Sequence, residues 1–206
     1  MIKRMSGTLA LVLVLVLSGA GIGHAYWSAH GELTGRVAVG TLSMTQTGVD
    51  GLAAAFTTDV TEVTAPVVVT NDGTVSAPFA LSFTGAPAAA EGTGQSSGDL
   101  GAATLVSVWP AADAASCASV PAGDAPDGST SSTGWNAIPP LLGTLEPGGS
   151  AVHCVRAVID PARAAPGDTV VVTSSLTSGI GSWSSTSTAD FGQSFSDDAI
   201  VSPHSF

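Results

Sequence analysis

The chain has few charged residues and hardly any basic ones. Of its 206 residues only 10% are charged, and Lys3 is its one lysine. Once residues 1–25 are set aside, 16 acidic residues face three arginines, which leaves a formal net charge of −13. A surface of this sign repels phosphate groups, so nucleic acid and anionic lipid are excluded as main partners. The acidic residues are scattered and form no D-x-D-x-D loop, so we attribute the charge to solubility rather than to binding of divalent cations.

The usual catalytic motifs are also missing. The sequence contains no H-E-x-x-H zinc motif, no G-x-S-x-G nucleophile elbow and no phosphate-binding or dinucleotide-binding glycine loop. His30-Gly-Glu32 lacks the second histidine of a zinc site, and His153 has no recognisable partner segment for a Ser-His-Asp triad. The remaining histidines are His24 and His204. The sequence therefore predicts a protein without catalytic residues, metal ligands or a cofactor.

Long apolar runs are absent except near the N-terminus. Residues 9–17 read LALVLVLVL after two basic residues, and small residues follow, with Gly23 and Ala25 placed at −3 and −1 of a cleavage site. This order is typical of a secretory signal peptide. Nine residues span only about 14 Å as a helix, against a hydrocarbon core of about 30 Å. We expect export, cleavage before Tyr26 and membrane contact only through residues 1–25; retention as an uncleaved anchor is the alternative.

Cysteine is rare. Cys117 and Cys154 are the two cysteines, and both follow the predicted signal peptide. In an exported protein an even pair is most simply one disulfide. Closing the loop between residues 117 and 154 with a disulfide stabilises the fold by about 4 kcal/mol in the loop-entropy model. Two buried thiols or a metal-binding pair are the alternatives.

Helical periodicity is lacking after the signal, and period-two alternation takes its place. In residues 151–159 the set Val152, Cys154, Arg156 and Val158 alternates with His153, Val155, Ala157 and Ile159. Seven segments of this kind are predicted as strands: 37–45, 63–70, 77–84, 104–109, 151–159, 169–176 and 181–191.

These strands predict an all-β fold, an antiparallel two-sheet β-sandwich of jelly-roll type that forms a single domain over residues 26–206. Asn71-Asp-Gly73 is expected to turn the chain between two strands, because its residues tolerate positive φ. Residues 85–103 and 111–134 are rich in Ala, Gly and Ser and are predicted as long loops. Proline cannot donate to a ladder, so Pro66 and Pro78 are expected at strand starts or edges, and Pro110 is expected to end a strand.

Several short segments resemble one family of secreted proteins. Gly23-His-Ala-Tyr-Trp-Ser-Ala-His30, followed by Val37-Ala-Val-Gly-Thr-Leu-Ser-Met44, resembles the pattern G-T-(Y/W)-A-(Y/A)-F-(S/N)-D … F-x-x-G-T-L-D-L of the TasA/camelysin (CalY) family. The matching motif residues are Tyr26, Trp27, Gly40, Thr41 and Leu42. The strand–turn–strand segment of residues 67–81 and Leu145-Glu-Pro-Gly-Gly-Ser150 also resemble family segments. The chain departs from the pattern at Ala29, where Asp is usual, and at His24.

The resemblance implies a jelly-roll-like sandwich, export through a dedicated SipW-type signal peptidase and, as in the best-known relatives, a role in extracellular biofilm fibres. In such fibres the N-terminal segment of one subunit completes a sheet of the next. We therefore expect a secreted, non-catalytic surface or matrix protein, with homo-oligomers or fibres as its assembly. The alternatives are a camelysin-type metallopeptidase and an adhesin or carbohydrate-binding module. A glycan site would use exposed aromatics, for which the candidates are Tyr26, Trp27, Trp109, Trp135 and Trp183.

Overall fold

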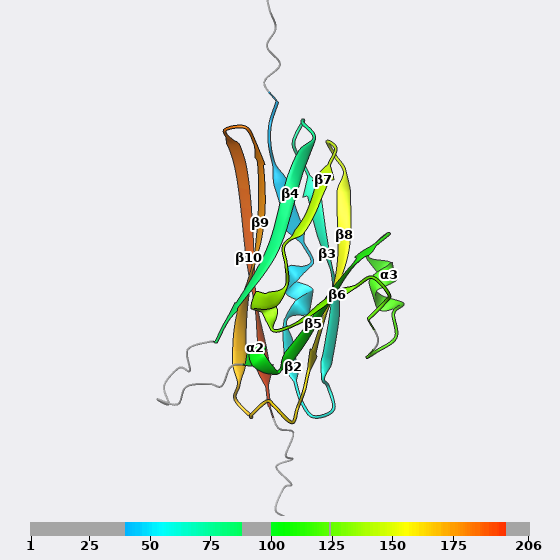
Figure 1. Ribbon diagram of the computed structural model, residues 1–206, viewed down its shortest axis with the longest axis vertical. Coiled ribbons are helices and arrows are strands. Elements are labelled where there is room, and N and C mark those ends of the chain that lie inside the picture. The colour runs from blue at the N-terminus through cyan, green and yellow to red at the C-terminus, as the bar shows by residue number, and fades with distance from the viewer. Residues whose placement is uncertain (1–39, 88–99, 124, 197–206) are drawn as a thin grey trace, which may run out of the picture. The chain divides into compact units, whose positions relative to one another are not determined.

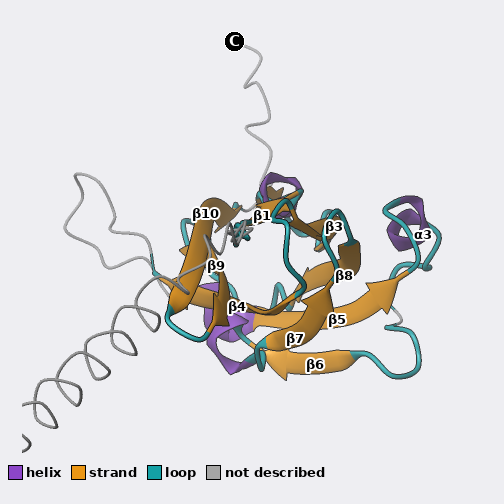
Figure 2. Cartoon of the chain, turned by 90° about the horizontal axis from the view of Figure 1, so that it is seen from above, coloured by secondary structure: helices purple, strands orange, loops and turns teal. Residues whose placement is uncertain are grey.

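The alternating segments form two five-stranded β-sheets that pack face to face (Figures 1 and 2). This computed structural model describes residues 40–87, 100–123 and 125–196. Sheet A has the order β1 (Met44–Thr47), β3 (Glu62–Asn71), β8 (Ser150–Ile159), β5 (Thr104–Ala111) and β6 (Thr130–Thr133). Sheet B has the order β2 (Ala54–Phe56), β10 (Trp183–Phe195), β9 (Thr169–Ile180), β4 (Ala77–Ala86) and β7 (Leu141–Leu145).

The prediction of an all-β two-sheet sandwich is confirmed. Strand pairs are antiparallel except for β2 and β10, which run parallel. The chain changes sheet repeatedly, from β3 in sheet A to β4 in sheet B and back to β5. Each sheet therefore contains strands from distant parts of the sequence, and the fold depends on long-range pairing.

The core lies between the sheets and follows the period of two. The alternation predicted for β8 is present, and the structure shows that the face with Val155, Ala157 and Ile159 is the one buried against sheet B. Trp135, in the 3-10 helix Trp135–Ala137, fills one part of the core and is 1% exposed. Its ring centroid lies 5.6 Å from that of Phe83 and 5.1 Å from that of Phe191. Such aromatic contacts add roughly 0.5–1.5 kcal/mol each to the burial of their surface.

Six predicted strands match observed strands and one is placed differently. The strand predicted for residues 37–45 begins only at Met44, because residues Thr41 to Ser43 bond to the turn after β3 instead of to a neighbouring strand. Residues 37–39 of that prediction lie outside the described residues. Pro110 does not end β5 but lies within it, paired with His153. The neighbouring strand β6 pairs only with Leu105 to Val108, so Pro110 lies at a free edge where no N–H is required.

The two predicted loops contain regular structure. Residues 85–103 begin with the end of β4 and end with the short helix α2 (Leu100–Ala103). Residues 111–134 contain helix α3 (Ala115–Ala118) and the edge strand β6. These elements lack an alternating apolar pattern, which explains why the loop prediction was wrong there.

The two other prolines lie where the ladder permits them. Pro78 is the second residue of β4, as expected. Pro66 is in the middle of β3, but β1 pairs only with Val68 to Asn71, so the strand edge beside Pro66 is not paired with β1. Sequence position alone did not reveal this local edge.

Candidate functional site

Three segments that carry the family resemblance meet at one end of the sandwich. Thr41 and Ser43 lie against the turn between β3 and β4, and the turn between β7 and β8 packs beside Asn71. We call this region the N-terminal junction; it comprises residues 40–43, 71–76 and 145–149. In Figure 1 the described chain begins at this end, at the top of the view. The junction is therefore the place where the described chain begins, at Gly40.

Backbone groups hold residues 40–43, which we call the entering segment. The N–H groups of Asp72 and Gly73 donate to the carbonyl oxygen of Ser43 at 3.0 and 3.1 Å, and the N–H of Thr74 donates to that of Thr41 at 2.9 Å. In return, the N–H of Thr41 donates to Oγ1 of Thr74 at 2.8 Å. Most of these bonds join backbone N–H and carbonyl groups, so they depend on the path of the main chain rather than on the identity of the side chains.

Asn71 is the centre of the junction and is completely buried. Its Nδ2 donates to the carbonyl oxygens of Val75 and Leu145 at 2.8 and 2.9 Å. Its Oδ1 accepts from the N–H of Gly73 at 2.9 Å. Its own N–H donates to the carbonyl of Gly149, and its carbonyl accepts from Gly148. Asn71 thereby joins the two turns, and every one of its polar groups has a partner.

Close backbone approach explains two glycines of the junction. A Cβ atom on Gly73 would lie 2.4 Å from the carbonyl oxygen of Thr41 and 2.9 Å from the nitrogen of Ser43. Gly73 does not adopt the positive φ that the sequence suggested. A glycine is required there because the backbone of the entering segment leaves no room for a side chain. A Cβ atom on Gly40 would lie 2.4 Å from Cγ1 of Val75. The family-motif residue Gly40 therefore packs against the same turn.

The other family-motif residues have separate positions. Thr41 makes the junction bonds, and Leu42 is half-buried against the main core. Beyond them, Gln46 of β1 reaches sheet B: its Nε2 donates to the carbonyl of Ser187 at 2.9 Å, and Oγ of Ser174 donates to its Oε1 at 2.6 Å. The predicted cleavage residues Gly23, Ala25 and Tyr26, and the motif residues Tyr26 and Trp27, lie outside the described residues.

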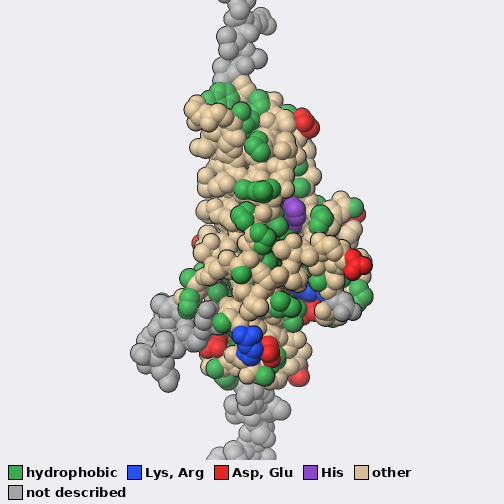
Figure 3. Space-filling view, viewed as in Figure 1, with side chains coloured by type: hydrophobic (Ala, Val, Ile, Leu, Met, Phe, Trp, Pro, Cys, Tyr) green, Lys and Arg blue, Asp and Glu red, His purple; other side chains and the backbone are tan. Residues whose placement is uncertain are grey.

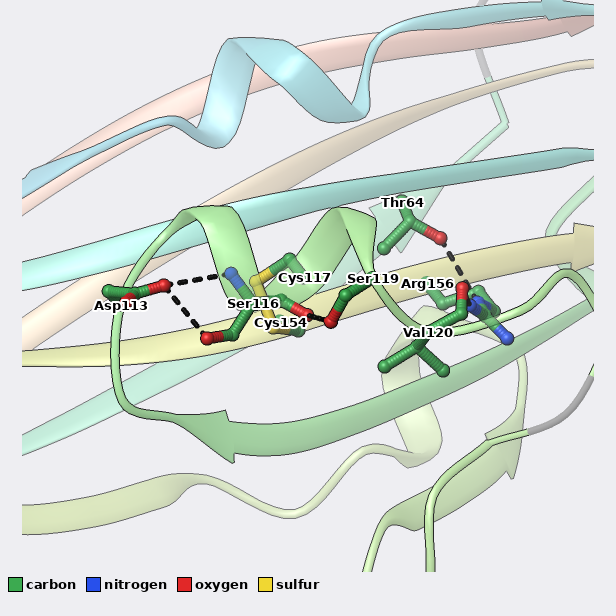
Figure 4. The surroundings of a disulfide bond; sticks show 8 residues. All are labelled: Thr64, Asp113, Ser116, Cys117, Ser119, Val120, Cys154 and Arg156. Carbon is green, nitrogen blue, oxygen red and sulfur yellow. Dashed lines mark hydrogen bonds between the residues drawn. A yellow bond between two sulfur atoms is a disulfide. The ribbon is translucent and has the colours of Figure 1, made fainter.

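The disulfide prediction is confirmed. Cys117 on α3 is bonded to Cys154 on β8, with their Cα atoms 5.3 Å apart (Figure 4). The bond lies on the outer face of sheet A, where both cysteines and Trp109 form a small buried cluster apart from the main core. Asp113 lies two residues before the helix, and its Oδ1 accepts from both the N–H and Oγ of Ser116. These bonds lower the pKa of Asp113.

Arg156 lies under the segment that the disulfide holds, and is 2% exposed. Its Nε contacts Glu62 Oε1 at 3.1 Å and donates to Oγ1 of Thr64 at 3.0 Å. Its Nη2 donates to the carbonyl of Val120 at 3.1 Å, and its guanidinium lies 5.3 Å from the ring centroid of Trp109. Sequence reasoning placed Arg156 on the same strand face as Cys154 but gave it no role. The structure shows that it fastens residues 111–123 to sheet A.

Candidate sites for metals and membranes were also sought among residues 40–87, 100–123 and 125–196. In this part of the chain, no three His, Cys, Asp or Glu side chains come together as a metal-binding group. None of its helices is both long enough and apolar enough to span a membrane. A pocket of about 390 Å³ beside Trp135 has Arg163 as the one charged residue in its lining.

The tryptophans differ sharply in exposure. Trp109 and Trp135 are buried, as a structural role requires, whereas Trp183 is 45% exposed. Trp183 pairs across the β9–β10 hairpin with Ile180, which is 38% exposed, so two apolar side chains lie at the hairpin tip. This surface is the one place among the described tryptophans where an aromatic ring could contact a partner.

The sequence matches no family model and no curated protein. Solved structures with a similar arrangement of strands include an ASH/PapD-like domain of human CEP192, with 11% identity, a TM-score of 0.33, and coverage of 75% of this chain and 84% of that domain. The CooA pilin subunit of enterotoxigenic Escherichia coli has 12% identity and a TM-score of 0.33, and the match covers 74% of this chain and 98% of that subunit. AggA, the major subunit of aggregative adherence fimbriae type I from Escherichia coli, has 11% identity and a TM-score of 0.31. The match covers 82% of this chain and 99% of AggA. With TM-scores below 0.5, these similarities carry no conclusion about this chain.

Proposed function

We propose that this chain is a secreted, non-catalytic protein of the cell surface or extracellular matrix that self-associates by β-strand addition. In this proposal residues 1–25 are removed by a SipW-type signal peptidase, as the resemblance to TasA/camelysin proteins implies. The segment from Tyr26 to the N-terminal junction then pairs either with its own sandwich or with an exposed sheet edge of another copy. N-terminal sequencing of secreted protein tests the first step, with Tyr26 expected as the first residue.

The composition of the edge strands carries the proposal. The outermost strands of the two sheets, β1, β2, β6 and β7, read MTQT, AAF, TSST and LLGTL. None contains a charged residue or a proline, which are the usual devices that prevent edge-to-edge pairing. These strands are short, which itself limits edge-to-edge pairing. In a chain with a formal net charge of −11, uncharged edges are where two copies repel each other least.

The way residues 40–43 are held also supports exchange of the N-terminal segment between two copies. Its junction bonds are mostly between backbone groups, so the same bonds can form with the segment of a second copy. Pairing within one copy is favoured in dilute solution, because a short tether gives an effective concentration in the millimolar range. Exchange between copies then requires a high protein concentration or weaker charge repulsion.

Acid is the condition that tests this function. The sequence pI is about 4.3, so repulsion between copies falls as the pH approaches that value. Mature protein spanning residues 26–206 should be monomeric at pH 7 and low salt, and should form elongated assemblies as the pH is lowered toward 4.3. Light scattering and electron microscopy give the readout. Concentrated protein that stays monomeric over this whole range contradicts the proposal.

Binding to glycans is the second candidate function, and the exposed hairpin tip is the observation that favours it. Trp183 beside Ile180 offers an apolar platform of the kind that stacks on sugar rings. A glycan array probed with monomeric protein and with Trp183→Ala separates the two candidates. Binding that depends on Trp183 favours an adhesin or carbohydrate-binding module over a fibre subunit.

A further inference from the structure

One titratable side chain lies between the two sheets without a partner for its buried nitrogen. His153 is on the inner face of β8, half-buried, and its Nε2 is buried and makes no hydrogen bond. Its imidazole contacts the ring of Phe79 on β4 edge-to-face, with centroids 6.3 Å apart. Figure 3 shows a histidine side chain at the surface of this face, and His153 is the one histidine among residues 40–87, 100–123 and 125–196. A proton can therefore reach the ring even though Nε2 points into apolar surroundings.

Phe79 connects this histidine to the edge strand β7. Phe79 pairs with Gly143, the middle residue of β7. A Cβ atom on Gly143 would lie 2.5 Å from Cε1 of Phe79, so the phenyl ring occupies the space of the missing side chain. Gly143 thus contributes no side chain to the core, and the ring of Phe79 fills its place at the middle of β7. The two ends of β7 are held by Leu141 and Leu145, which pack on the main core, and by the hydrogen bond from Asn71 to Leu145. The neighbouring Leu142 is 75% exposed and adds no anchor.

The surroundings of His153 offer no countercharge. His153 pairs with Val67 of β3 and Pro110 of β5 and contacts Phe79 of β4. The charged residues in β3, β4, β5, β7 and β8 are Glu62 and Arg156. These two residues bind each other on the outer face of sheet A. The carboxylates nearest in sequence, Glu146 and Asp160, lie outside the strands and are exposed. A proton on His153 would therefore create a cation against apolar side chains with no carboxylate facing it.

We propose that His153 is a proton-operated gate on β7: its protonation loosens β7 from β4 and opens the edge of β4 to a strand from a second copy of this chain. This inference rests on the proposed self-association and adds to it the identity of the edge that accepts the strand. The opened edge is the part of β4 that pairs with β7, residues Ala77 to Leu81. An incoming strand with an uncharged, β-prone sequence restores the same backbone hydrogen bonds.

The direction of the pH dependence follows from the burial of His153. Desolvation lowers the pKa of His153 from its ordinary value of 6.5. The open state therefore binds more protons than the closed state as the pH falls below 6.5. The closed state is fully stable above that value and loses stability as the pH falls through the lowered pKa.

Hydrogen exchange measured on mature protein at pH 7.5 and 5.0 tests the gate. After correction for intrinsic rates, the amides of residues 141–145 should exchange about tenfold faster at the lower pH, because the open state gains a proton there. The change should be lost in His153→Phe, which keeps an aromatic ring but cannot bind a proton. His204→Phe is the matched control and should behave as the unchanged protein does. The same acid response in His153→Phe overturns the gate.

Assembly measured on the same variants distinguishes the gate from the proposed function. If the gate controls assembly, His153→Phe should assemble at a lower pH than the unchanged protein. Equal assembly of both proteins overturns the gate and leaves strand addition standing. Absence of assembly in both proteins contradicts the proposed function itself, while a loss of β7 protection that depends on His153 would still support the gate as a local opening.

Discussion

Asn71 on β3 and Leu145 at the end of β7 are joined across the two sheets by a hydrogen bond from Nδ2 to the carbonyl oxygen, 2.9 Å long. The same asparagine fixes the turn that receives the N-terminal segment. One buried side chain thus couples the closure of the sandwich at this end to the position at which residues 40–43 enter it. The N-terminal junction is for this reason a built structure rather than a chance crossing of loops.

Replacing Asn71 should destabilise the protein strongly. Asn71→Leu leaves the buried carbonyls of Val75 and Leu145 without their donor, at a cost of about 3 kcal/mol in the free energy of unfolding. Denaturant unfolding followed by tryptophan fluorescence measures the loss. Asp72→Ala, next in sequence but exposed, loses only a bond from Thr45 and should cost less than about 1 kcal/mol. Equal effects of the two substitutions would show that Asn71 is not the centre of the junction.

The glycines provide a matched pair of tests. Gly73→Ala forces a Cβ atom against the backbone of Thr41 and Ser43, which should cost about 1–3 kcal/mol. Gly192→Ala is the control, because its Cβ atom would meet no atom within 4 Å and Gly192 has no positive φ. That substitution should change stability by less than about 0.5 kcal/mol, because it is an ordinary surface change. A tolerated Gly73→Ala would mean that the entering segment does not press on the turn.

The disulfide should contribute to stability without being required for folding. Replacing Cys117 and Cys154 together by serine should lower the free energy of unfolding by about 2–4 kcal/mol. The main core lies between the sheets and does not include these cysteines, so the double variant should remain folded and exported. Circular dichroism and denaturant unfolding of both proteins give the comparison. Loss of all strand signal in the variant would contradict the separation of the two clusters.

Arg156 should matter far more than the other described arginine. Arg156→Met removes the ion pair with Glu62 and the donor to the carbonyl of Val120, which should cost about 3 kcal/mol. Glu62 keeps the bond that it accepts from the N–H of Gly123. Limited proteolysis should then cut residues 111–123 faster, because their attachment to sheet A is weakened. Arg163→Met, at an exposed position, is the control and should have an effect below about 0.5 kcal/mol. Proteolysis at the same rate in both variants would argue against the fastening role.

Alternation along the longest strands allowed them to be predicted from sequence. In β8 the two alternating sets were separated correctly, and the structure shows that one faces the core whereas the other holds Cys154 and Arg156. The edge strands were missed for a physical reason. In β6 no apolar residue marks a buried face, and in β7 a glycine replaces the side chain that would have completed the pattern. Their positions are set by pairing with distant strands.

The junction could be predicted only in part. Each of its three segments was recognised separately by its resemblance to a family pattern, but nothing in the sequence showed that they meet. Asn71 was read as a turn residue, whereas the structure makes it a buried link between β3 and β7. The gate residue His153 carried no motif at all. Its unpartnered nitrogen follows from the packing of one sheet on the other, which periodicity does not reveal.

Assembly of mature protein with and without residues 26–36 is the measurement that tests strand addition most directly. Both proteins are concentrated at pH 7 and brought to the sequence pI of about 4.3, and growth is followed by light scattering. A protein lacking residues 197–206 is the control for the loss of a terminal segment of similar length. The account predicts that the unchanged protein and the C-terminal control assemble, whereas the N-terminal deletion stays folded and monomeric. Assembly of the N-terminal deletion at the same rate as the unchanged protein would contradict it.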